Sequence, residues 1–573
     1  MGRPAAVKAW RIIPRPILES VLNNHAQHHR VPKPILLLHG PRGVGKTSLL
    51  LHRLLPDWNN GPHLSAYVDF ASDDAASALS SYPATTSTPW WSASSSSPPR
   101  PLGPLCASLE RELESLVDRG VHLGAIGSRD VFAALDRWHG LHAALRRVIG
   151  PGLRLSSRRD ESAAALWAKA VLAFSARIGP GEIDVAASGG GGSLRRRYSM
   201  EEVAYVREAM VALRLAKEVI GMHQEWRREA VRHLNRTGGF SRPLANSATA
   251  WPCLLLEILS EAAQVDFFQP KLVINNIDGL RKATSTEDDS TVSAAMYHDS
   301  FIWRLIALGV NEGCLPVILV TSDSYYSYQA FIDFGFPDIF ISRETFGWRP
   351  QEAKLHMVSD FFSEPEWKVI DEVLGPNPRH LSELYALKGS THYQDLMQNS
   401  RSSFEDIVDA YLAYLQVTVV NPAMESALVI LQKFSSDARA RKIPETRLFF
   451  GAPWRHPPRT DDPVASLKWA KVQLMDFVQS FVNAEFGVNY LGDDSLEILD
   501  DPSAVAMLEV GLLYAQRDPS FIRPISRGIQ RCLVRWLVQQ RMQLSLQEFL
   551  LYLWQRIIRG RSYRHLMKEI GYK

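Results

Sequence analysis

The segment HGPRGVGKTS, residues 39–48, carries the residue types and the spacing that phosphate binding requires. It matches G-x-x-x-x-G-K-[ST] at Gly40, Gly45, Lys46 and Thr47. Glycines let the backbone curl so that successive N–H groups face a phosphate, and the N-terminus of the following helix adds positive potential. Lys46 is expected to reach the β- and γ-phosphates, and the Thr47 hydroxyl to bind Mg²⁺. The residues expected to contact the nucleotide are Gly40, Pro41, Arg42, Gly43, Val44, Gly45, Lys46, Thr47 and Ser48.

Flanking segments indicate how this loop is held. Residues 34–40, PILLLHG, form an apolar run typical of a buried parallel strand, and a helix is expected from the loop to about Pro56. Further strands are expected at residues 65–71, 271–274 and 315–322. Because these strands alternate with helical patterns, the sequence predicts an α/β fold with a parallel sheet covered on both faces.

The stretch KLVINNIDGL, residues 271–280, ends the predicted third strand with two asparagines. Hydrolysis of a Mg²⁺-bound nucleotide usually needs a carboxylate for the metal shell and a base for the attacking water, both near this position. LVINNID resembles the pattern L-V-I-D-E-I-D of archaeal-type P-loop ATPases in the AAA+/STAND group, as a degenerate Walker B motif. The resemblance implies that Asn275 replaces the magnesium-binding aspartate and Asn276 the catalytic glutamate, with Asp278 as the trailing aspartate.

These replacements predict weak or absent ATP hydrolysis. An asparagine can hold a metal-bound water by hydrogen bonding but cannot take a proton at neutral pH. Asp278 is the nearest carboxylate that could substitute. The alternative is that Asp278 only caps the turn before Gly279.

Two more segments resemble this group of ATPases. Thr321 ends the predicted fourth strand, where the family keeps a polar sensor residue, although a threonine there also suits an ordinary turn. LGPNPRHLSELY, residues 374–385, resembles the start of the family's helical lid, which implies that Arg379 senses the phosphates. A simple helix start after a proline-rich turn is the other interpretation.

The sequence predicts four regions. A basic segment covers residues 1–30, and a P-loop ATPase core covers 31–345 with a helical and low-complexity insertion at about 76–250. A helical lid follows at 346–440. Residues 441–573 contain a helix, a hairpin and a helix, which is similar to a winged-helix domain, and end in a tail rich in arginine and lysine.

Composition limits the class of protein. With 573 residues, 46% hydrophobic and 22% charged, the chain is expected to form two or three packed units of a globular protein. Its net charge of +3 does not by itself indicate nucleic-acid binding, and its four cysteines form no C-x-x-C pair. We therefore expect a soluble intracellular protein without a membrane span, in the cytoplasm or an organelle.

The leading hypothesis is an ATP- and Mg²⁺-binding switch that acts on a protein partner or on further copies of itself. Catalytic positions would be Asn276, Asp278, Thr321 and Arg379, and metal positions Thr47 and Asn275. One alternative is an active oligomeric ATPase that remodels protein or nucleic acid. Another is an adaptor that binds nucleic acid through the basic C-terminal tail.

Overall fold

A computed structural model describes most of the helices and strands of the chain. The described residues are 10, 12–27, 34–71, 100–137, 140–150, 162–176, 199–237, 250–284, 294–309, 315–335, 338–358, 360–390, 403–443, 457–459, 462–482, 488–489, 501–517 and 521–554. The basic tail from residue 555 and the low-complexity residues 87–99 and 188–193 lie outside them.

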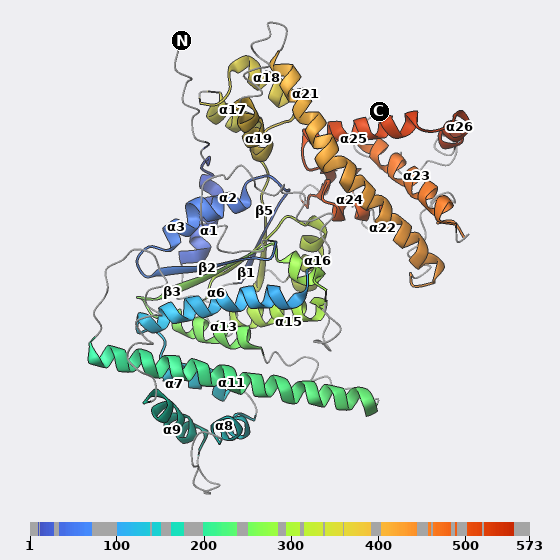
Figure 1. The fold of residues 1–573 in the computed structure, drawn as a ribbon. Helices are drawn as coiled ribbons and strands as arrows, with labels where there is room; N and C mark the ends of the chain where they lie inside the picture. The colour runs from blue at the N-terminus through green and yellow to red at the C-terminus, as the bar shows by residue number, and fades with distance from the viewer. Residues whose placement is uncertain are drawn as a thin grey trace.

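The centre of the molecule is a parallel sheet (Figure 1). Its strands run in the order β2-β3-β4-β1-β5. They are β1 (Ile35–His39), β2 (His63–Asp69), β3 (Gln269–Asn275), β4 (Val317–Thr321) and β5 (Phe340–Glu344). The first four confirm the predicted strands. The sequence did not predict β5, because this edge strand is only half-buried and carries Ser342, Arg343 and Glu344 in a row.

Helices cover both faces of this sheet. On one face, Leu36, Leu38 and Val320 pack against α1 (Pro16–Gln27) and the helix that follows the phosphate loop. That helix runs through α2 (Lys46–Leu49), a π-helical turn (Leu50–Leu54) and α3 (Leu55–Trp58). The other face packs against α6 (Leu102–His122), α13 (Trp251–Ala262) and α15 (Ala294–Ala307). The α/β arrangement expected from the sequence is therefore present.

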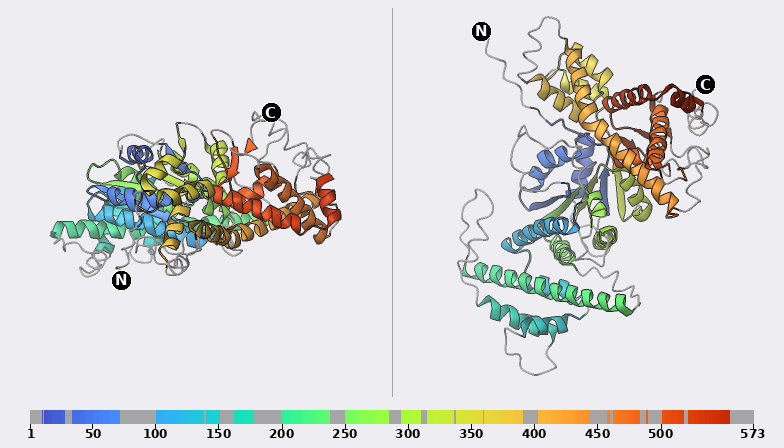
Figure 2. Two further views of the ribbon diagram at one scale, coloured as in Figure 1. Left: turned by 90° about the horizontal axis from the view of Figure 1, so that it is seen from above. Right: turned by 45° about the vertical axis from the view of Figure 1, so that its right-hand side comes forward.

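The insertion contributes to the core. Its first described helix, α6, packs on β2 and shares one hydrophobic cluster with the sheet. Behind it lie α7 (Ser128–Asp136), α8 (Leu141–Ile149), α9 (Ala163–Ser175) and the long α11 (Met200–Thr237), at the end of the molecule opposite the helices of residues 350–388 (Figures 1 and 2). Buried Glu257 on α13 binds Arg137 at 3.2 Å and Arg304 at 2.7 Å, which ties the end of α7 to α13 and α15.

The C-terminal half is mostly helical. The region of the expected lid contains α17 (Pro350–Met357), α18 (Glu364–Val373), α19 (Pro378–Lys388), α21 (Phe404–Leu415), a π-helical turn (Gln416–Val420) and α22 (Asn421–Arg439). Beyond it lie α23 (Pro463–Val482), β6 (Val488–Asn489), α24 (Pro502–Glu509), β7 (Leu513–Ala515), β8 (Phe521–Pro524), α25 (Arg527–Met542) and α26 (Leu546–Trp554). The three strands form an antiparallel sheet in the order β6-β8-β7, with the predicted hairpin between β7 and β8.

One hydrophobic cluster joins these two expected regions. It includes Met357 from α17, Ile370 from α18, Phe477 from α23, and Met507 and Trp536 from the helices around the hairpin. Because the apolar residues of both regions are buried together, separating them would expose a core. We therefore treat residues 350–554 as one packed unit, called here the C-terminal unit.

One described helical stretch passes a length and composition test for a membrane span. It is Phe404–Arg439, which comprises α21, the π-helical turn and α22. In the structure 44% of its most apolar window is buried, and the core helix of a soluble protein passes the same test.

Candidate functional site

The phosphate loop has the geometry that its glycines suggest. Gly43 and Gly45 have φ angles of 81° and 86°, which glycine adopts with little strain. A side chain at Gly40 could not be accommodated, because its Cβ would lie 2.1 Å from the carbonyl oxygen of Thr345. The loop thus joins β1 to α2 with its backbone curled, as phosphate binding requires.

Lys46 lies over this loop. Its side chain is buried, and Nζ donates hydrogen bonds to the carbonyl oxygens of Gly40 at 2.7 Å and Pro41 at 2.9 Å. Thr47 is half-buried beside it and Ser48 is exposed. Val44 is buried, with Gly347 close to its side chain.

Positive charge is crowded around the loop. Burial lowers the pKa of Lys46 to about 7, and repulsion from Arg42 and Arg15 acts in the same direction, whereas attraction to Asp278 opposes the shift. Burial also lowers the pKa of Arg42, against attraction to Asp278 and Asp323. Arg15 donates to the Thr345 hydroxyl at 3.1 Å and to the Phe346 carbonyl at 2.8 Å. An anion at this place would relieve the mutual repulsion.

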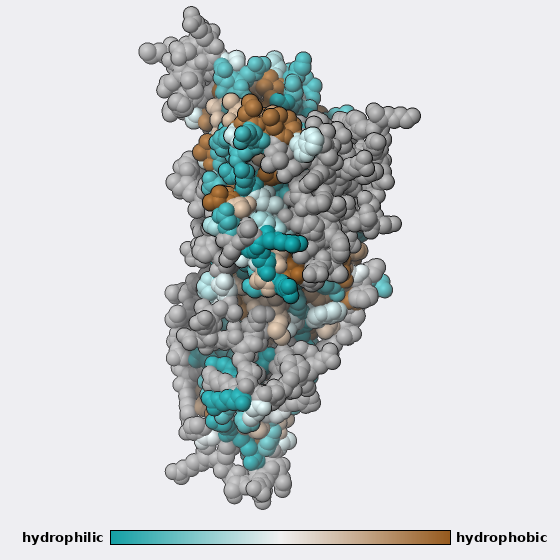
Figure 3. All heavy atoms as spheres, turned by 90° about the vertical axis from the view of Figure 1, so that its right-hand side faces the viewer, coloured by the Kyte–Doolittle hydropathy of each residue, from teal (hydrophilic) through white to brown (hydrophobic). Residues whose placement is uncertain are grey.

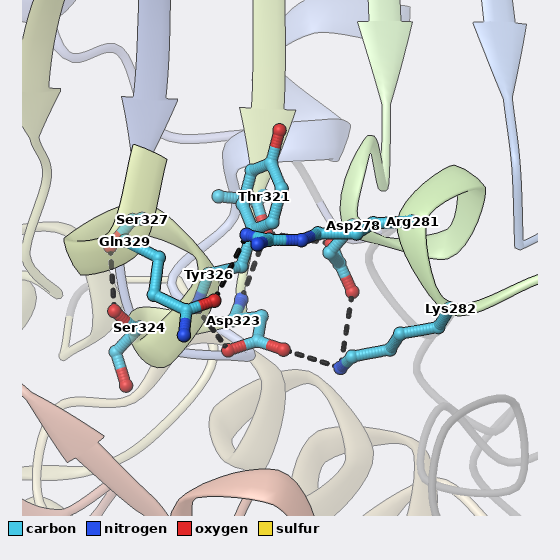
Figure 4. A network of polar contacts seen from close by, with 9 residues as sticks. All are labelled: Asp278, Arg281, Lys282, Thr321, Asp323, Ser324, Tyr326, Ser327 and Gln329. Atoms are coloured by element: carbon cyan, nitrogen blue, oxygen red, sulfur yellow. Dashed lines mark hydrogen bonds and ion pairs between the residues drawn. The ribbon is translucent and has the colours of Figure 1, made fainter. Parts of the chain in front are cut away.

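Asp278 takes part in a polar network at the carboxyl ends of β3 and β4 (Figure 4). The Thr321 hydroxyl donates to its Oδ1 at 2.7 Å, and the Lys282 ammonium lies 3.7 Å from its Oδ2. Lys282 also binds Asp323, and attraction to both aspartates raises the pKa of Lys282 against the lowering effect of burial. Asp278 is the first residue of α14 (Asp278–Lys282), so it starts a helix and also faces the cations of the loop.

Asp323 is the other carboxylate of this network. Burial raises its pKa, but the ion pair and hydrogen bond with Lys282, the Tyr326 backbone N–H and the charge of Arg42 outweigh burial and lower the pKa overall. Its Oδ1 accepts from the Tyr326 N–H at 3.0 Å and caps α16 (Ser324–Phe334). Asp323 therefore helps to position Lys282 beside Asp278.

The two asparagines turn toward β2. Asn275 Nδ2 donates to the Tyr67 hydroxyl at 3.0 Å and to Asp69 Oδ2 at 2.9 Å. Asn276, at a φ of 53°, donates from Nδ2 to Asp69 Oδ1 at 2.8 Å. Asp69 also accepts from the Ala71 N–H at 2.9 Å and from the Tyr67 hydroxyl at 3.2 Å. Four donors saturate this carboxylate, since a carboxylate has about four acceptor sites.

Helix α19 begins directly on the phosphate loop. Asn377 caps it by accepting from the Arg379 N–H at 3.0 Å. A Cβ at Gly43 would lie 2.8 Å from Asn377 Oδ1 and 3.3 Å from Arg379 Cβ, so the helix end and the loop are in van der Waals contact. The Arg379 side chain reaches along its own helix to Glu383 at 2.8 Å. The Cβ of Arg379 thus lies beside the loop, while its Nε is bound to a carboxylate of α19. A role of Arg379 in sensing phosphates stays a prediction.

The hairpin of the C-terminal unit also docks on the loop. The Tyr514 hydroxyl on β7 donates to Glu344 at 2.6 Å and lies 3.0 Å from His39 Nδ1, so His39 must donate from Nδ1. Burial and repulsion from Arg517 and Lys46 hold the pKa of His39 well below its usual value, which keeps the ring neutral. Gly511 lies so close to Arg42 that a Cβ there would be 2.7 Å from the guanidinium.

The structure thus brings together most of the predicted site. Residues 40–48, Asp278, Thr321 and Arg379 surround one place at the carboxyl edge of the sheet. Asn275 is the last residue of β3, and Asn276 follows it. The amides of both residues donate to Asp69 on β2. Sequence reasoning missed Asp69, although an acid at the end of the strand SAYVDFA was a usable signal. It also missed Tyr514 and Gly511, for which the sequence carried no signal.

Comparisons with known proteins add little to this geometry. No family model and no curated protein matches the chain. The chain is similar to a solved structure, the Walker-type ATPase PABY2304 of Pyrococcus abyssi. The match spans 91% of this chain and 96% of the other, with 11% identity and a TM-score of 0.34. A similarity with this TM-score does not establish a shared function. The class of site, a phosphate loop between a parallel strand and a helix in an α/β fold, follows from the residues and their geometry.

Proposed function

We propose that this protein binds ATP with Mg²⁺ and acts as a nucleotide-dependent switch with weak or no hydrolysis. The observation that carries the proposal is the crowding of Lys46, Arg42 and Arg15 at a phosphate loop, where Asp278 attracts Lys46 and Arg42 and Glu352 attracts Arg15. A triphosphate would bring further negative charge to these cations. The loop N–H groups and Lys46 would hold the phosphates, while Thr47 and Asp278 would face the metal.

The residues present fit a magnesium ion in part. Mg²⁺ is commonly held by one or two protein oxygens together with phosphates and water, and it supplies charge neutralisation for the phosphates. The Thr47 hydroxyl and the Asp278 carboxylate provide such oxygens. Asn275 uses both amide hydrogens on β2, which leaves only its carbonyl oxygen for a metal-bound water.

Slow turnover follows from the same hydrogen bonds. Asn276 cannot accept a proton, and the neighbouring Asp69 is occupied by four donors. A positioned general base typically contributes about 10² to 10⁴ in rate. Without one, bound ATP would persist long enough to mark a state of the protein.

The C-terminal unit is the part that would respond to the nucleotide. It contacts the loop through Asn377 at the start of α19, Gly511 beside Arg42, and Tyr514 beside His39. Because its helices share one apolar core, a change at these contacts would move the unit as a body. Suppose that the C-terminal unit can occupy two positions relative to the loop, and that a nucleotide pairs with Arg42 more strongly in one of them. Nucleotide binding would then increase the population of that position.

A turnover and binding assay tests the proposal. We expect purified protein to bind ATP, Lys46→Ala to lose most of this binding, and Lys46-dependent hydrolysis to stay well below about 1 s⁻¹, the low end of typical enzymes. Hydrolysis at or above that rate would overturn the switch. Equal ATP affinity in the wild type and in Lys46→Ala would overturn the binding site itself.

One observation favours the alternative of an active ATPase, namely the hydrogen bond from Thr321 to Asp278. It orients a carboxylate near the loop, as a catalytic base would require. Hydrolysis above the limit that disappears in Asp278→Asn would support that function.

The nucleic-acid adaptor receives less support from the described residues. Helix α25 follows the hairpin and carries four arginines that could face a nucleic-acid backbone. However, its arginines contact the C-terminal unit itself: Arg527 binds the Asp371 carbonyl, Arg531 the Glu372 carbonyl and Arg535 the Asp409 carboxylate.

A further inference from the structure

Lys282 pairs with two carboxylates at the edge of the sheet where the phosphate loop is located (Figure 4). Its ammonium lies 3.7 Å from Asp278 Oδ2 and forms an ion pair and a hydrogen bond with Asp323 Oδ2. Asp278 is the first residue of α14 and Lys282 the last, whereas Asp323 lies between β4 and α16. The lysine therefore joins two elements, which a salt bridge within one helix would not do.

The two oxygens of Asp278 are held differently. Oδ1 accepts a hydrogen bond from the Thr321 hydroxyl at 2.7 Å, a normal length for such a bond. Oδ2 faces the Lys282 ammonium at 3.7 Å, which is too long for a hydrogen bond, so the attraction there is electrostatic. Oδ2 is thus the oxygen of Asp278 that a different cation could bind.

Lys282 can be reached from the solvent. Its side chain is 51% exposed, whereas the side chains of Asp278 and Asp323 are 16% and 6% exposed. Figure 3 shows hydrophilic side chains at the surface at mid-height of the molecule, the level at which the sheet lies in Figure 1. A hydrated cation can therefore approach Lys282 without unfolding α14.

A carboxylate beside a triphosphate is unfavourable unless a cation offsets its charge. Asp278 attracts Lys46 and Arg42 of the phosphate loop, so it would also face the phosphates of a bound nucleotide. In many nucleotide sites a metal ion supplies the positive charge between the two anions. In this protein the Lys282 ammonium, which is positive at neutral pH, already supplies one positive charge at Asp278.

We propose that Lys282 competes with Mg²⁺ for Asp278, and that ATP binding by this protein is therefore nearly independent of Mg²⁺. Two cations beside one carboxylate oxygen repel each other, so Mg²⁺ can contact Asp278 only after Lys282 has moved away. A metal ion can still accompany the nucleotide on its phosphates, but the affinity does not require it. This inference rests on the proposed function and adds a second reason for slow hydrolysis.

A displaced lysine would find another carboxylate nearby. Burial raises the pKa of Glu509 at the end of α24, and the positive charge of Lys282 opposes that shift, so the two groups lie within electrostatic reach. Glu509 belongs to the C-terminal unit, as does Gly511, which approaches Arg42. Movement of Lys282 from Asp278 toward Glu509 would therefore change a contact of the C-terminal unit.

Titration calorimetry with ATP, in excess Mg²⁺ and in excess chelator, tests the proposal. For the wild type, the two affinities should differ by less than about threefold. Lys282→Met removes the charge but keeps an apolar side chain of similar length, so its affinity should fall about tenfold in chelator and recover in Mg²⁺. Lys282→Arg keeps a cation that can pair with both carboxylates and should behave like the wild type.

A second measurement needs no nucleotide. Mn²⁺ can replace Mg²⁺ as a paramagnetic probe, and its binding to the free protein can be followed by electron paramagnetic resonance. Lys282→Met should bind Mn²⁺ about tenfold more tightly than the wild type, because Asp278 has lost its competing cation. Equal Mn²⁺ affinities would overturn the competition.

Lys217→Met is the matched control. Lys217 on α11 is 54% exposed and forms an ion pair with Glu114 at 2.6 Å, outside the phosphate loop. This variant should leave both affinities for ATP unchanged. Absence of ATP binding in both conditions would overturn the proposed function and this inference with it.

Other results would overturn the competition alone. They are wild-type ATP binding that weakens about tenfold or more in chelator, or the same Mg²⁺ dependence in the wild type and Lys282→Met. The wild-type comparison uses no variant, so it decides the question even if Lys282→Met does not fold.

Discussion

The carboxyl ends of β1 and β3 lie at the same edge of one sheet, yet their polar groups are organised in opposite ways. At the end of β1, the cations Lys46 and Arg42 face each other, with attraction from Asp278 only partly offsetting their repulsion. At the end of β3, Asn275 and Asn276 donate to Asp69, which accepts its full set of hydrogen bonds.

The difference shows what each strand end can do. A group of crowded cations gains from an incoming anion, so the end of β1 is suited to binding phosphate. A saturated carboxylate with its amide donors gains nothing from a ligand and would lose hydrogen bonds by rearranging. The end of β3 therefore stabilises the sheet, and the chemistry left to this edge depends on Asp278.

The largest expected effect comes from restoring the acid at the end of β3. Asn275→Asp removes two N–H donors and places a second carboxylate about 3 Å from Asp69. We expect a loss of about 3 kcal/mol in the free energy of unfolding, with no gain in hydrolysis. Urea unfolding measures the first and phosphate release the second.

A second substitution makes this prediction specific. Asp69→Asn in the Asn275→Asp background exchanges the two groups and should recover most of the lost stability. If Asn275→Asp is as stable as the wild type, or if it gains hydrolysis, the end of β3 is not the closed arrangement described above.

The next effect concerns Asp278 at the open end. Asp278→Asn removes the carboxylate that faces Lys46 but keeps a side chain able to accept from Thr321. Any Lys46-dependent hydrolysis should fall about 10²-fold, because a base or metal-shell group is lost. ATP affinity in the absence of Mg²⁺ should rise, because a negative charge near the phosphates is removed. The hydrolysis rate in the presence of Mg²⁺ measures the first effect, and ATP affinity in the presence of a chelator measures the second. If neither changes, Asp278 acts only at the start of helix α14.

The sequence predicted the elements of this edge better than the contacts between them. The apolar runs of β1 to β4 and the glycine spacing of residues 40–47 have strong local patterns, and the structure confirms the strands. The edge strand β5 was missed because its polar residues give no such pattern. The pairing of Asn275 and Asn276 with Asp69 depends on β2 lying beside β3, across about 200 intervening residues, and no local pattern encodes it.

Docking of the hairpin on the loop was beyond prediction for the same reason. Tyr514 meets His39 across 475 positions of sequence. Gly511 is recognisable as a glycine in a turn, but its approach to Arg42 follows from how the C-terminal unit packs on the sheet.

His380 on α19 predicts a loss of stability in acid, because it is fully hydrogen-bonded like Asp69 and close to a cation like Lys46. His380 is saturated like Asp69, by Tyr411 at 2.9 Å and Ser526 at 2.8 Å. Burial lowers its pKa to about 3, and repulsion from Arg379 adds to the effect. The unfolded state, with a histidine pKa of about 6.5, binds the proton first as pH falls, so this stability is present above about pH 6.5 and is lost toward pH 3.

The expected change is about 2 kcal/mol between pH 7 and pH 5. Other histidines contribute to the same profile, so the useful measurement is the difference between the wild type and His380→Gln in urea unfolding at each pH. The wild type should lose stability more steeply. Parallel curves would mean that His380 is not held neutral by its surroundings.

The smallest effect tests whether the C-terminal unit presses on the loop. Gly511→Ala places a Cβ 2.7 Å from the Arg42 guanidinium at a residue whose φ is 73°. Gly61→Ala is the matched control, because Gly61 has a φ of 66° and no atom within 4 Å of the added Cβ. Both should lose about 1 kcal/mol from the strained φ.

Only Gly511→Ala should lose more, by roughly a further 1 kcal/mol, since Arg42 is long enough to move but is packed in a crowded place. Combining it with Arg42→Ala should remove this extra cost, and urea unfolding of the single and double variants measures it. Hydrogen exchange at residues 513–515 should accelerate in Gly511→Ala and not in Gly61→Ala. If the two glycine variants lose the same stability, the contact between Gly511 and Arg42 does not contribute to stability. A nucleotide bound at Arg42 would then not act on the C-terminal unit through Gly511.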